Sequence, residues 1–342
     1  MGINVASLDI GIDLGTAVIV ATDADYTHTL REEAVVAVDA RTGKVLAIGD
    51  EVRNMIGRTP PHIRVIRPLV GGVVSDFDTT EILIKYLLKK ICTNAFVKPR
   101  VCICVPSGIT SVESQAVIDA AVSAGARKVF LIEEPVAAAI GAGMDISRPN
   151  GNLIVDVGGG TTDIAVLSLN GIVCKTSLKS AGMEFDEALI RYMRGRYNLL
   201  IGNRTAQEIK MEIGSVDPDS EDAAADIKGR HLLNGLPRKM SIRRSELVSV
   251  YEPVAQNIIK AVQGVLEKTP PELVGDIRDN GIVLTGGGAQ LGGLDVLMEK
   301  RTKTKCNIAE NPQDCVAIGT ARSFKYLTTL YDGFITPSMH AH

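Results

Sequence analysis

The sequence predicts an α/β protein built from two related halves. Two glycine-containing hairpin patterns carry this prediction, "SLDIGIDLGTAVIVATD" at residues 7–23 and "LIVDVGGGTTDIAVLSLNG" at residues 153–171. Both give the order apolar, Asp, apolar, Gly and then Thr, which indicates two half-molecules with one plan. Helical patterns at 79–92 and 111–124 alternate with the apolar strands "RVCICVP" and "KVFLIEEP", as is typical of a layered α/β domain.

The second half repeats strands and helices in a similar order. We expect strands from 153 to 179, a helix near 185–200 and a long helix from about 245 to 268. The polar segment at 215–240 predicts an outer subdomain with a charged loop at 217–222.

The hairpin glycines suit a phosphate-bearing ligand. Glycine permits backbone conformations that other residues avoid, and it lets a ligand approach the amides closely. Asp13 and Asp156 each follow an apolar strand residue and precede a glycine turn, so halves folded face to face would bring two carboxylates toward one phosphate chain. Carboxylates beside phosphates imply Mg²⁺, bound directly or through water. The alternative is a structural hairpin that needs glycine only to turn.

A third glycine turn follows the apolar strand at 282–284. It contains Gly286, Gly287 and Gly288 and precedes "LGGLDVLMEKR", a helical pattern. We expect its amides and a helix N-terminus to face a nucleotide.

Composition and charge exclude several classes of protein. The 342 residues are 45% hydrophobic and 23% charged, with a formal net charge of -3, which is ordinary for a globular protein with two sizeable cores. No basic run with interleaved aromatics favours nucleic acid. Six cysteines without metal-binding spacing indicate reduced thiols in the cytoplasm. No apolar run reaches the roughly 18 to 20 residues of a membrane span, so we expect neither insertion across a membrane nor secretion.

Several motifs together resemble one family along nearly the whole chain. They are "GRTPPHIRVIRPLVGGVVSDFD", "VFLIEEPVAAAIGAG", "VDVGGGTTDIAVLSLNG", "EIGS" and "GIVLTGGGAQL", in that order. This set is similar to the MreB family of the actin-like ATPase superfamily. The resemblance implies an actin-like (ribonuclease H-like) two-domain fold, each domain with a core subdomain and a smaller outer one. The implied limits are domain I at 1–142 plus about 315–342, with its outer part at about 30–71, and domain II at 143–314, with its outer part at about 181–242.

The resemblance also implies a function. It indicates an ATP-binding filament that organises cell-wall synthesis and rod shape at the inner face of the plasma membrane, with slow ATP hydrolysis coupled to polymerisation. The implied partners are further copies of the chain in paired protofilaments, the inner membrane surface, and membrane proteins of the RodZ and MreC/MreD types. Two alternatives stay open: a nonhydrolysing, nucleotide-bound scaffold filament, and a monomeric ATPase of the sugar-kinase or chaperone type that shares the actin fold.

Residue roles follow from the same resemblance. Asp13 and Asp156 would organise Mg²⁺, and Glu134 would orient the attacking water, although a carboxylate there can also cap the next helix. The phosphate-binding positions are Gly15, Thr16, Ala17, Gly158, Gly159, Gly160, Thr161 and Thr162. The remaining nucleotide-binding positions are Gly182, Gln207, Lys210, Gly286, Gly287 and Gly288.

Three departures from the family pattern affect turnover more than binding. Val18 stands where the family has Asn, Met183 stands where it has Asp in "AGMEFDE", and Gln207 replaces a glutamate expected at the sugar. An amide retains hydrogen bonding but lacks the strength that a carboxylate's charge gives. We therefore expect nucleotide binding and slow hydrolysis.

A short apolar segment resembles the family's membrane-insertion loop. Phe96 and Val97 lie beside Lys98 and Arg100. Burying the two apolar side chains contributes at most about 1.5 to 3 kcal/mol each, and a basic neighbour about 1 kcal/mol at an anionic surface. One subunit would bind weakly, and a filament would bind through many loops. Packing of Phe96 into its own domain is the alternative.

Overall fold

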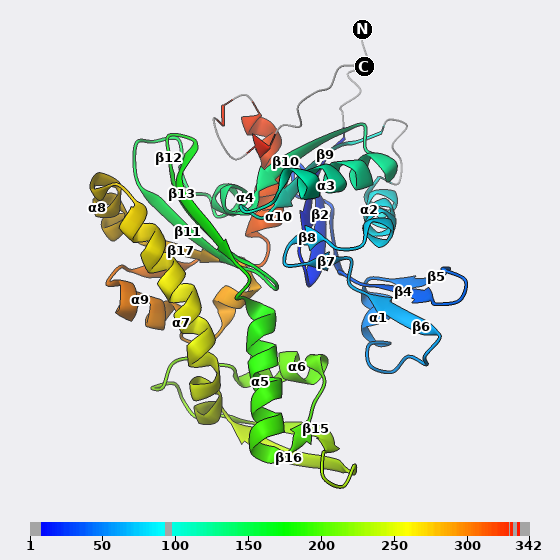
Figure 1. Cartoon of the computed structure of the whole chain (residues 1–342). Helices are drawn as coiled ribbons and strands as arrows, with labels where there is room; N and C mark the ends of the chain where they lie inside the picture. The colour runs from blue at the N-terminus through cyan, green and yellow to red at the C-terminus, as the bar shows by residue number, and fades with distance from the viewer. Residues whose placement is uncertain (1–7, 93–97, 328, 331–333, 336–342) are drawn as a thin grey trace.

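Two core sheets organise the chain, as seen in a computed structural model that describes residues 8–92, 98–327, 329–330 and 334–335 (Figure 1). The first sheet has the order β19-β10-β9-β1-β2-β3 and the second the order β13-β12-β11-β17-β18. The first sheet contains β1 (Asp9–Leu14), β2 (Val18–Asp23), β3 (Thr29–Glu33), β9 (Arg100–Val105), β10 (Lys128–Glu133) and β19 (Phe334–Ile335). The second contains β11 (Asn152–Val157), β12 (Thr162–Ser168), β13 (Gly171–Leu178), β17 (Ile282–Thr285) and β18 (Cys306–Ile308).

Helices cover both sheets and fill the space between them. α2 (Phe77–Ile91) and α3 (Ser111–Ser123) share a core with the first sheet, and α5 (Gly182–Tyr197) and α7 (Arg244–Lys268) share one with the second. α8 (Pro271–Asn280) and α9 (Leu294–Thr302) also lie on the second half. α4 (Glu134–Gly141) and α10 (Cys315–Arg322) lie between the sheets, in a core that includes residues of both.

The contact between α4 and α10 is close enough to require glycine. A Cβ at Gly141 would lie 1.8 Å from the carbonyl oxygen of Cys315, and one at Gly319 would lie 1.7 Å from that of Ala137. No side chain fits at such distances, so the two glycines allow the backbones to touch. This contact ties the C-terminal helix to the junction between the two sheets.

Each half also carries a small outer subdomain (Figure 1). The first contains β4 (Val36–Asp39), β5 (Val45–Ile48), β6 (Ile63–Ile66) and α1 (Asp50–Arg53), and β7 (Leu69–Val70) and β8 (Val73–Val74) lead back to the core. The second contains β14 (Leu199–Leu200), β15 (Ala224–His231), β16 (Pro237–Arg243) and α6 (Asn203–Ile213). The polar segment expected at 215–240 thus supplies β15 and most of β16.

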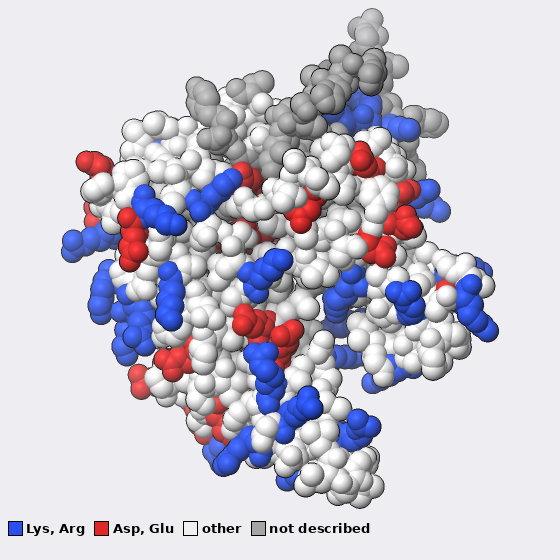
Figure 2. Space-filling view, in the orientation of Figure 1, with Lys and Arg blue, Asp and Glu red and all other residues white. Residues whose placement is uncertain are grey.

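The predicted long helices are present with small shifts at their ends. The helix expected at 79–92 is α2, which begins two residues earlier because Asp76 caps it by accepting a 3.0 Å hydrogen bond from the Thr79 amide. The helix expected near 245–268 is α7. Among the described helices, none combines the length and apolar character needed to cross a membrane. Figure 2 shows Lys and Arg interspersed with Asp and Glu over the face in view.

Candidate functional site

The two glycine hairpins are the same structure built twice. In the first, Leu14 pairs with Ile19 across β1 and β2; in the second, Val157 pairs with Thr162 across β11 and β12. Both turns therefore span the same number of residues, and Asp13 occupies the position that Asp156 occupies in the other half. The repeat predicted from the sequence is present in the backbone register.

The tips of the two hairpins meet. A Cβ at Gly160 would lie 2.5 Å from Thr16 Oγ1, and a Cβ at Gly159 would lie 2.8 Å from the Cβ of Ala17. Thr16 Oγ1 also accepts a 2.9 Å hydrogen bond from the Gly72 amide. The bare backbone of the second hairpin thus lets the two halves close on one another at the place where the sequence predicts a phosphate chain.

Several other hairpin residues make close contacts or hydrogen bonds within the protein. A Cβ at Gly15 would lie 2.5 Å from the Val18 carbonyl oxygen, so this glycine is required by its own turn. The Gly158 amide donates to the Thr161 carbonyl at 2.9 Å, and Thr162 Oγ1 donates to the Ser180 carbonyl at 2.7 Å. The hydroxyl proton of Thr162 is therefore already engaged within the second half.

Each hairpin aspartate lies in a place that disfavours its charge. Asp156 is 4% exposed, and its Oδ1 accepts a 2.8 Å hydrogen bond from Thr285 Oγ1; Asp13 Oδ1 accepts a 3.2 Å hydrogen bond from Cys104 Sγ. Burial raises the pKa of Asp13 to about 6 and that of Asp156 to about 7, although the two hydrogen bonds oppose the shift. Both groups therefore change charge close to neutral pH.

Glu134 is the first residue of α4 and is 7% exposed. Burial raises its pKa well above the ordinary range of a glutamate, and the negative charges of Asp163 and Asp156 add to the effect. The N-cap position belongs to Glu133, and no side-chain hydrogen bond caps this helix. Glu133 instead pairs with Lys175, with Oε1 2.6 Å from the ammonium nitrogen. The geometry thus favours neither glutamate as a helix cap.

Asp163 is a buried acid that the sequence pattern did not single out. It is fully buried, pairs in register with Asp156, and accepts a 3.0 Å hydrogen bond from the Ser107 amide of the other half. Its Oδ2 has no hydrogen-bond partner among the described residues, and burial raises its pKa. A charged residue inside the otherwise apolar strand "TDIAVLS" was the available signal.

The start of α5 lies against the second hairpin. Gly182 donates its amide to the Gly158 carbonyl at 3.0 Å, and Met183 donates to the Gly159 carbonyl at 2.8 Å. Lys210 donates to the Gly182 carbonyl at 2.6 Å and forms a 2.9 Å ion pair with Asp186. Gln207 lies one turn before Lys210 on α6. Lys210, one of the predicted nucleotide-binding residues, is thus joined to the second hairpin through α5.

The third glycine turn packs on the end of β11. A Cβ at Gly286 would lie 2.3 Å from the Val157 carbonyl oxygen, and one at Gly288 would lie 2.4 Å from Val157 Cγ1. Gly287 is more open, because a Cβ there would have its nearest neighbouring atom, on Gln313, 4.0 Å away. The expected helix start is wrong in detail: Gly287 and Gly288 belong to a short 3-10 turn, η1 (Gly287–Gln290), and α9 begins only at Leu294. The positive φ of Gly293 separates the two.

Comparison with known proteins agrees with this architecture. The family model described as MreB/Mbl protein matches residues 7–332. The chain belongs to the MreB/Mbl family. The actin-like fold predicted from the family resemblance is therefore confirmed.

The MreB/Mbl relatives cover almost the whole chain. The cell shape-determining protein Mbl of Bacillus cereus is 49% identical over 313 residues, covering 91% of this chain and 94% of the relative. The cell shape-determining protein MreB of Escherichia coli is 44% identical over 327 residues, covering 94% of each. The crystal structure of MreB5 of Spiroplasma citri bound to ADP has a TM-score of 0.89 at 35% identity, covering 94% of this chain and 97% of that one. A structure of the same protein bound to AMPPNP gives the same TM-score and identity.

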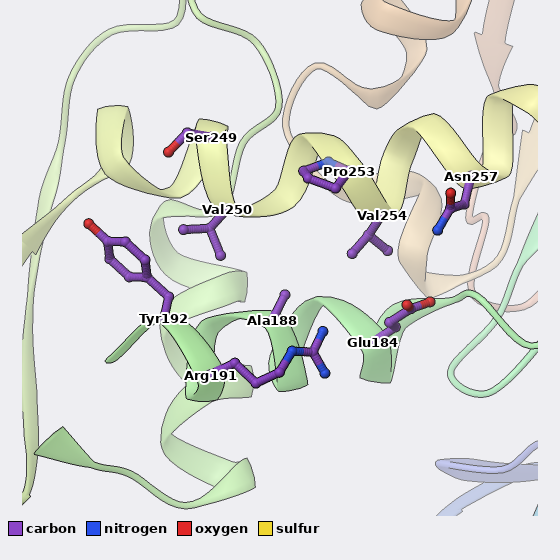
Figure 3. Close-up of a pocket in the computed structure, with 9 residues that line it drawn as sticks. All are labelled: Glu184, Ala188, Arg191, Tyr192, Ser249, Val250, Pro253, Val254 and Asn257. Atoms are coloured by element: carbon purple, nitrogen blue, oxygen red, sulfur yellow. The ribbon is translucent and has the colours of Figure 1, made fainter. Parts of the chain in front are cut away.

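Phe96 and Val97, which the sequence predicts to form a membrane-insertion loop, fall outside the described residues. A groove of about 350 Å³ lies between α5 and α7. Figure 3 shows Glu184 and Arg191 on its α5 side and Ser249 and Pro253 on its α7 side. None of the predicted site residues lines this groove. The candidate site is therefore the junction of the two hairpins.

Proposed function

We propose that this MreB/Mbl chain binds ATP with Mg²⁺ between its two hairpins and forms filaments that organise cell-wall synthesis and rod shape at the inner face of the plasma membrane. The observation that carries the proposal is the close approach of Gly160 to Thr16, which brings the two hairpin tips together. Asp13 and Asp156 occupy equivalent positions on the strands that lead into these tips. The ADP-bound and AMPPNP-bound structures of the similar MreB5 support the choice of nucleotide.

The carboxylates at the junction fit Mg²⁺ held largely through water. Among the described residues, no three His, Cys, Asp or Glu side chains are arranged to hold a metal directly. Mg²⁺ commonly keeps several waters and takes one or two carboxylates plus substrate phosphates. Burial raises the pKa values of Asp13 and Asp156 to about 6 and 7, and a divalent cation close to them would favour their ionised forms. The cation would supply positive charge against the phosphates and these two acids.

Glu134 is the residue that we assign to hydrolysis. It opens α4 beside Asp156 and Asp163, whose charges help to raise its pKa. A carboxylate can accept a hydrogen bond from the attacking water and align it, so Glu134 would act in its ionised form. This requirement supports a slow ATPase.

The cellular partners are assigned by family resemblance. We propose self-association into paired protofilaments, weak contact of each subunit with the membrane surface, and association with membrane proteins of the RodZ and MreC/MreD types. Polymerisation multiplies a weak membrane contact, since many subunits bind at once.

Sedimentation of the purified chain tests the proposal. The protein is spun with Mg²⁺ and ATP, and without nucleotide, and the pellets are imaged by negative stain. We expect ordered filaments that depend on nucleotide. A chain that binds ATP but stays monomeric at every concentration, and phosphorylates a small hydroxylated acceptor, would instead identify an actin-fold kinase. Filaments that retain ATP without releasing phosphate would identify a nonhydrolysing scaffold.

A further inference from the structure

Each hairpin aspartate has a partner on the neighbouring parallel strand. Asp13 of β1 lies in register with Cys104 of β9, and Asp156 of β11 lies in register with Thr285 of β17. Both partners donate a hydrogen bond to the Oδ1 atom of their aspartate, at 3.2 Å from Cys104 Sγ and 2.8 Å from Thr285 Oγ1. The same contact is therefore built once in each half.

We propose that Cys104 and Thr285 are equivalent positioning residues for Mg²⁺-dependent nucleotide binding. By holding Oδ1, each one fixes the rotation of its carboxylate and so presents the other oxygen in one direction. Groups that orient metal-organising side chains in this way affect metal affinity without touching the metal. The inference rests on the proposed function, because it assigns the residues that prepare its two aspartates.

The two contacts differ in strength. A hydroxyl is a stronger donor than a thiol, and the Thr285 contact is also the shorter one. Thr285 is fully buried, and Cys104 is 2% exposed, so water does not replace either donor easily. Asp156 is therefore held more firmly than Asp13, and loss of Thr285 has the larger effect.

Paired substitutions separate positioning from packing. Thr285→Val keeps the shape of the side chain and removes the donor, and Thr285→Ser restores the donor with less volume. Cys104→Ala and Cys104→Ser form the matching pair in the other half. Affinity for ADP is measured by calorimetry in Mg²⁺ and again in EDTA, and the thermal midpoint of each variant checks its folding.

We expect Thr285→Val to weaken ADP binding about tenfold in Mg²⁺ and to leave binding in EDTA unchanged. Thr285→Ser restores most of the loss. Cys104→Ala weakens binding about threefold in Mg²⁺, because one neutral hydrogen bond is lost, and Cys104→Ser binds at least as well as the wild type, because a hydroxyl is the stronger donor.

The outcomes distinguish this inference from the function on which it rests. A wild type that binds ADP more tightly with Mg²⁺, together with a folded Thr285→Val that behaves identically, overturns the inference alone. Equal losses in Mg²⁺ and EDTA also overturn it, because they indicate a packing role. A wild type that binds no ADP under either condition overturns both. If Thr285→Val fails to fold, the comparison of Cys104→Ala with Cys104→Ser decides.

Discussion

The first hairpin places Thr16, Ala17 and Val18 after its leading glycine, whereas the second places Gly159, Gly160 and Thr161 at the same positions. The difference continues into the returning strand, where Asp13 pairs with Val20 but Asp156 pairs with Asp163. One backbone plan thus carries two unequal sets of side chains. The comparison teaches that the two halves share one hairpin geometry, while the second half carries more polar side chains on it.

The largest effect concerns the acid that lies between the unequal halves. Glu134→Gln removes the carboxylate that we assign to the attacking water, and we expect ATP hydrolysis to fall by about 100-fold or more. ADP affinity changes little, because the glutamine keeps the shape of the side chain. Phosphate release under single-turnover conditions measures the first effect and calorimetry the second. Glu133→Gln is the matched control, and hydrolysis that falls equally in both variants would contradict the assignment.

The close approach of the hairpin tips predicts the next effect. Gly160→Ala adds a methyl group that would lie only 2.5 Å from Thr16 Oγ1, so the two hairpin tips must move apart. We expect ADP affinity to fall about tenfold, since small misplacements of binding groups are costly. Gly264→Ala, near the C-terminal end of α7 where a Cβ would meet no atom within 4 Å, serves as the control. Unchanged affinity in the folded Gly160→Ala variant would show that the tips need not meet.

The raised pKa values predict opposite pH trends for stability and binding. Asp13 and Asp156 bind protons up to pH values of about 6 and 7 when folded, against an ordinary value of 3.8. Between the ordinary value of 3.8 and these folded pKa values, the folded protein binds more protons than the unfolded chain. The contribution of the two acids to stability therefore falls as the pH rises through their folded pKa values. Binding of Mg²⁺ and ADP needs both acids ionised, so its affinity falls by about tenfold from about pH 8 to about pH 6.

Thermal midpoints of the nucleotide-free protein and calorimetry with ADP, each at several pH values, check these trends. ADP binding in EDTA is the control, since it involves no cation at the two acids. Stability and Mg²⁺-dependent affinity that rise together with pH would contradict the account.

Asp163 offers a way to make the two halves more alike. Asp163→Asn removes a negative charge that helps to raise the pKa of Asp156 and can still accept the hydrogen bond from the Ser107 amide. We expect the pH midpoint of Mg²⁺-dependent ADP binding to move to lower pH, with about a two- to threefold gain in affinity near neutrality, on the order of the effect of one nearby charge. Asp119→Asn, on the surface of α3, is the control. A midpoint that stays in place would show that Asp163 does not influence Asp156.

The smallest effect concerns Val18, an apolar residue at the position that Thr161 occupies in the second hairpin. Val18→Thr gives the first turn the residue that Thr161 provides in the second. We expect about a twofold gain in ADP affinity, the size of one partly exposed hydrogen bond. The reverse change, Thr161→Val, should weaken binding by a similar factor. Calorimetry measures both, and a gain for Thr161→Val would contradict the proposed equivalence.

The sequence predicted the parts of this site that are local. The order Asp, apolar, Gly, Thr identified both hairpins and both aspartates, because a turn and its flanking strands are encoded by neighbouring residues. It did not identify Asp163, Thr285 or Cys104 as partners of the acids, since those contacts depend on the register between strands far apart in the chain. The start of α9 was missed for a similar reason: the glycine turn packs on Val157 and continues as a 3-10 turn.

The most direct test of the account is the affinity of Asp13→Asn and Asp156→Asn for ADP, measured by calorimetry in Mg²⁺ and in EDTA. If both hairpins close on one nucleotide, each variant loses most of the tightening that Mg²⁺ gives, Asp156→Asn loses more, and binding in EDTA is unchanged. If either variant keeps the full Mg²⁺ effect, the two halves do not share one site, and the central claim is wrong.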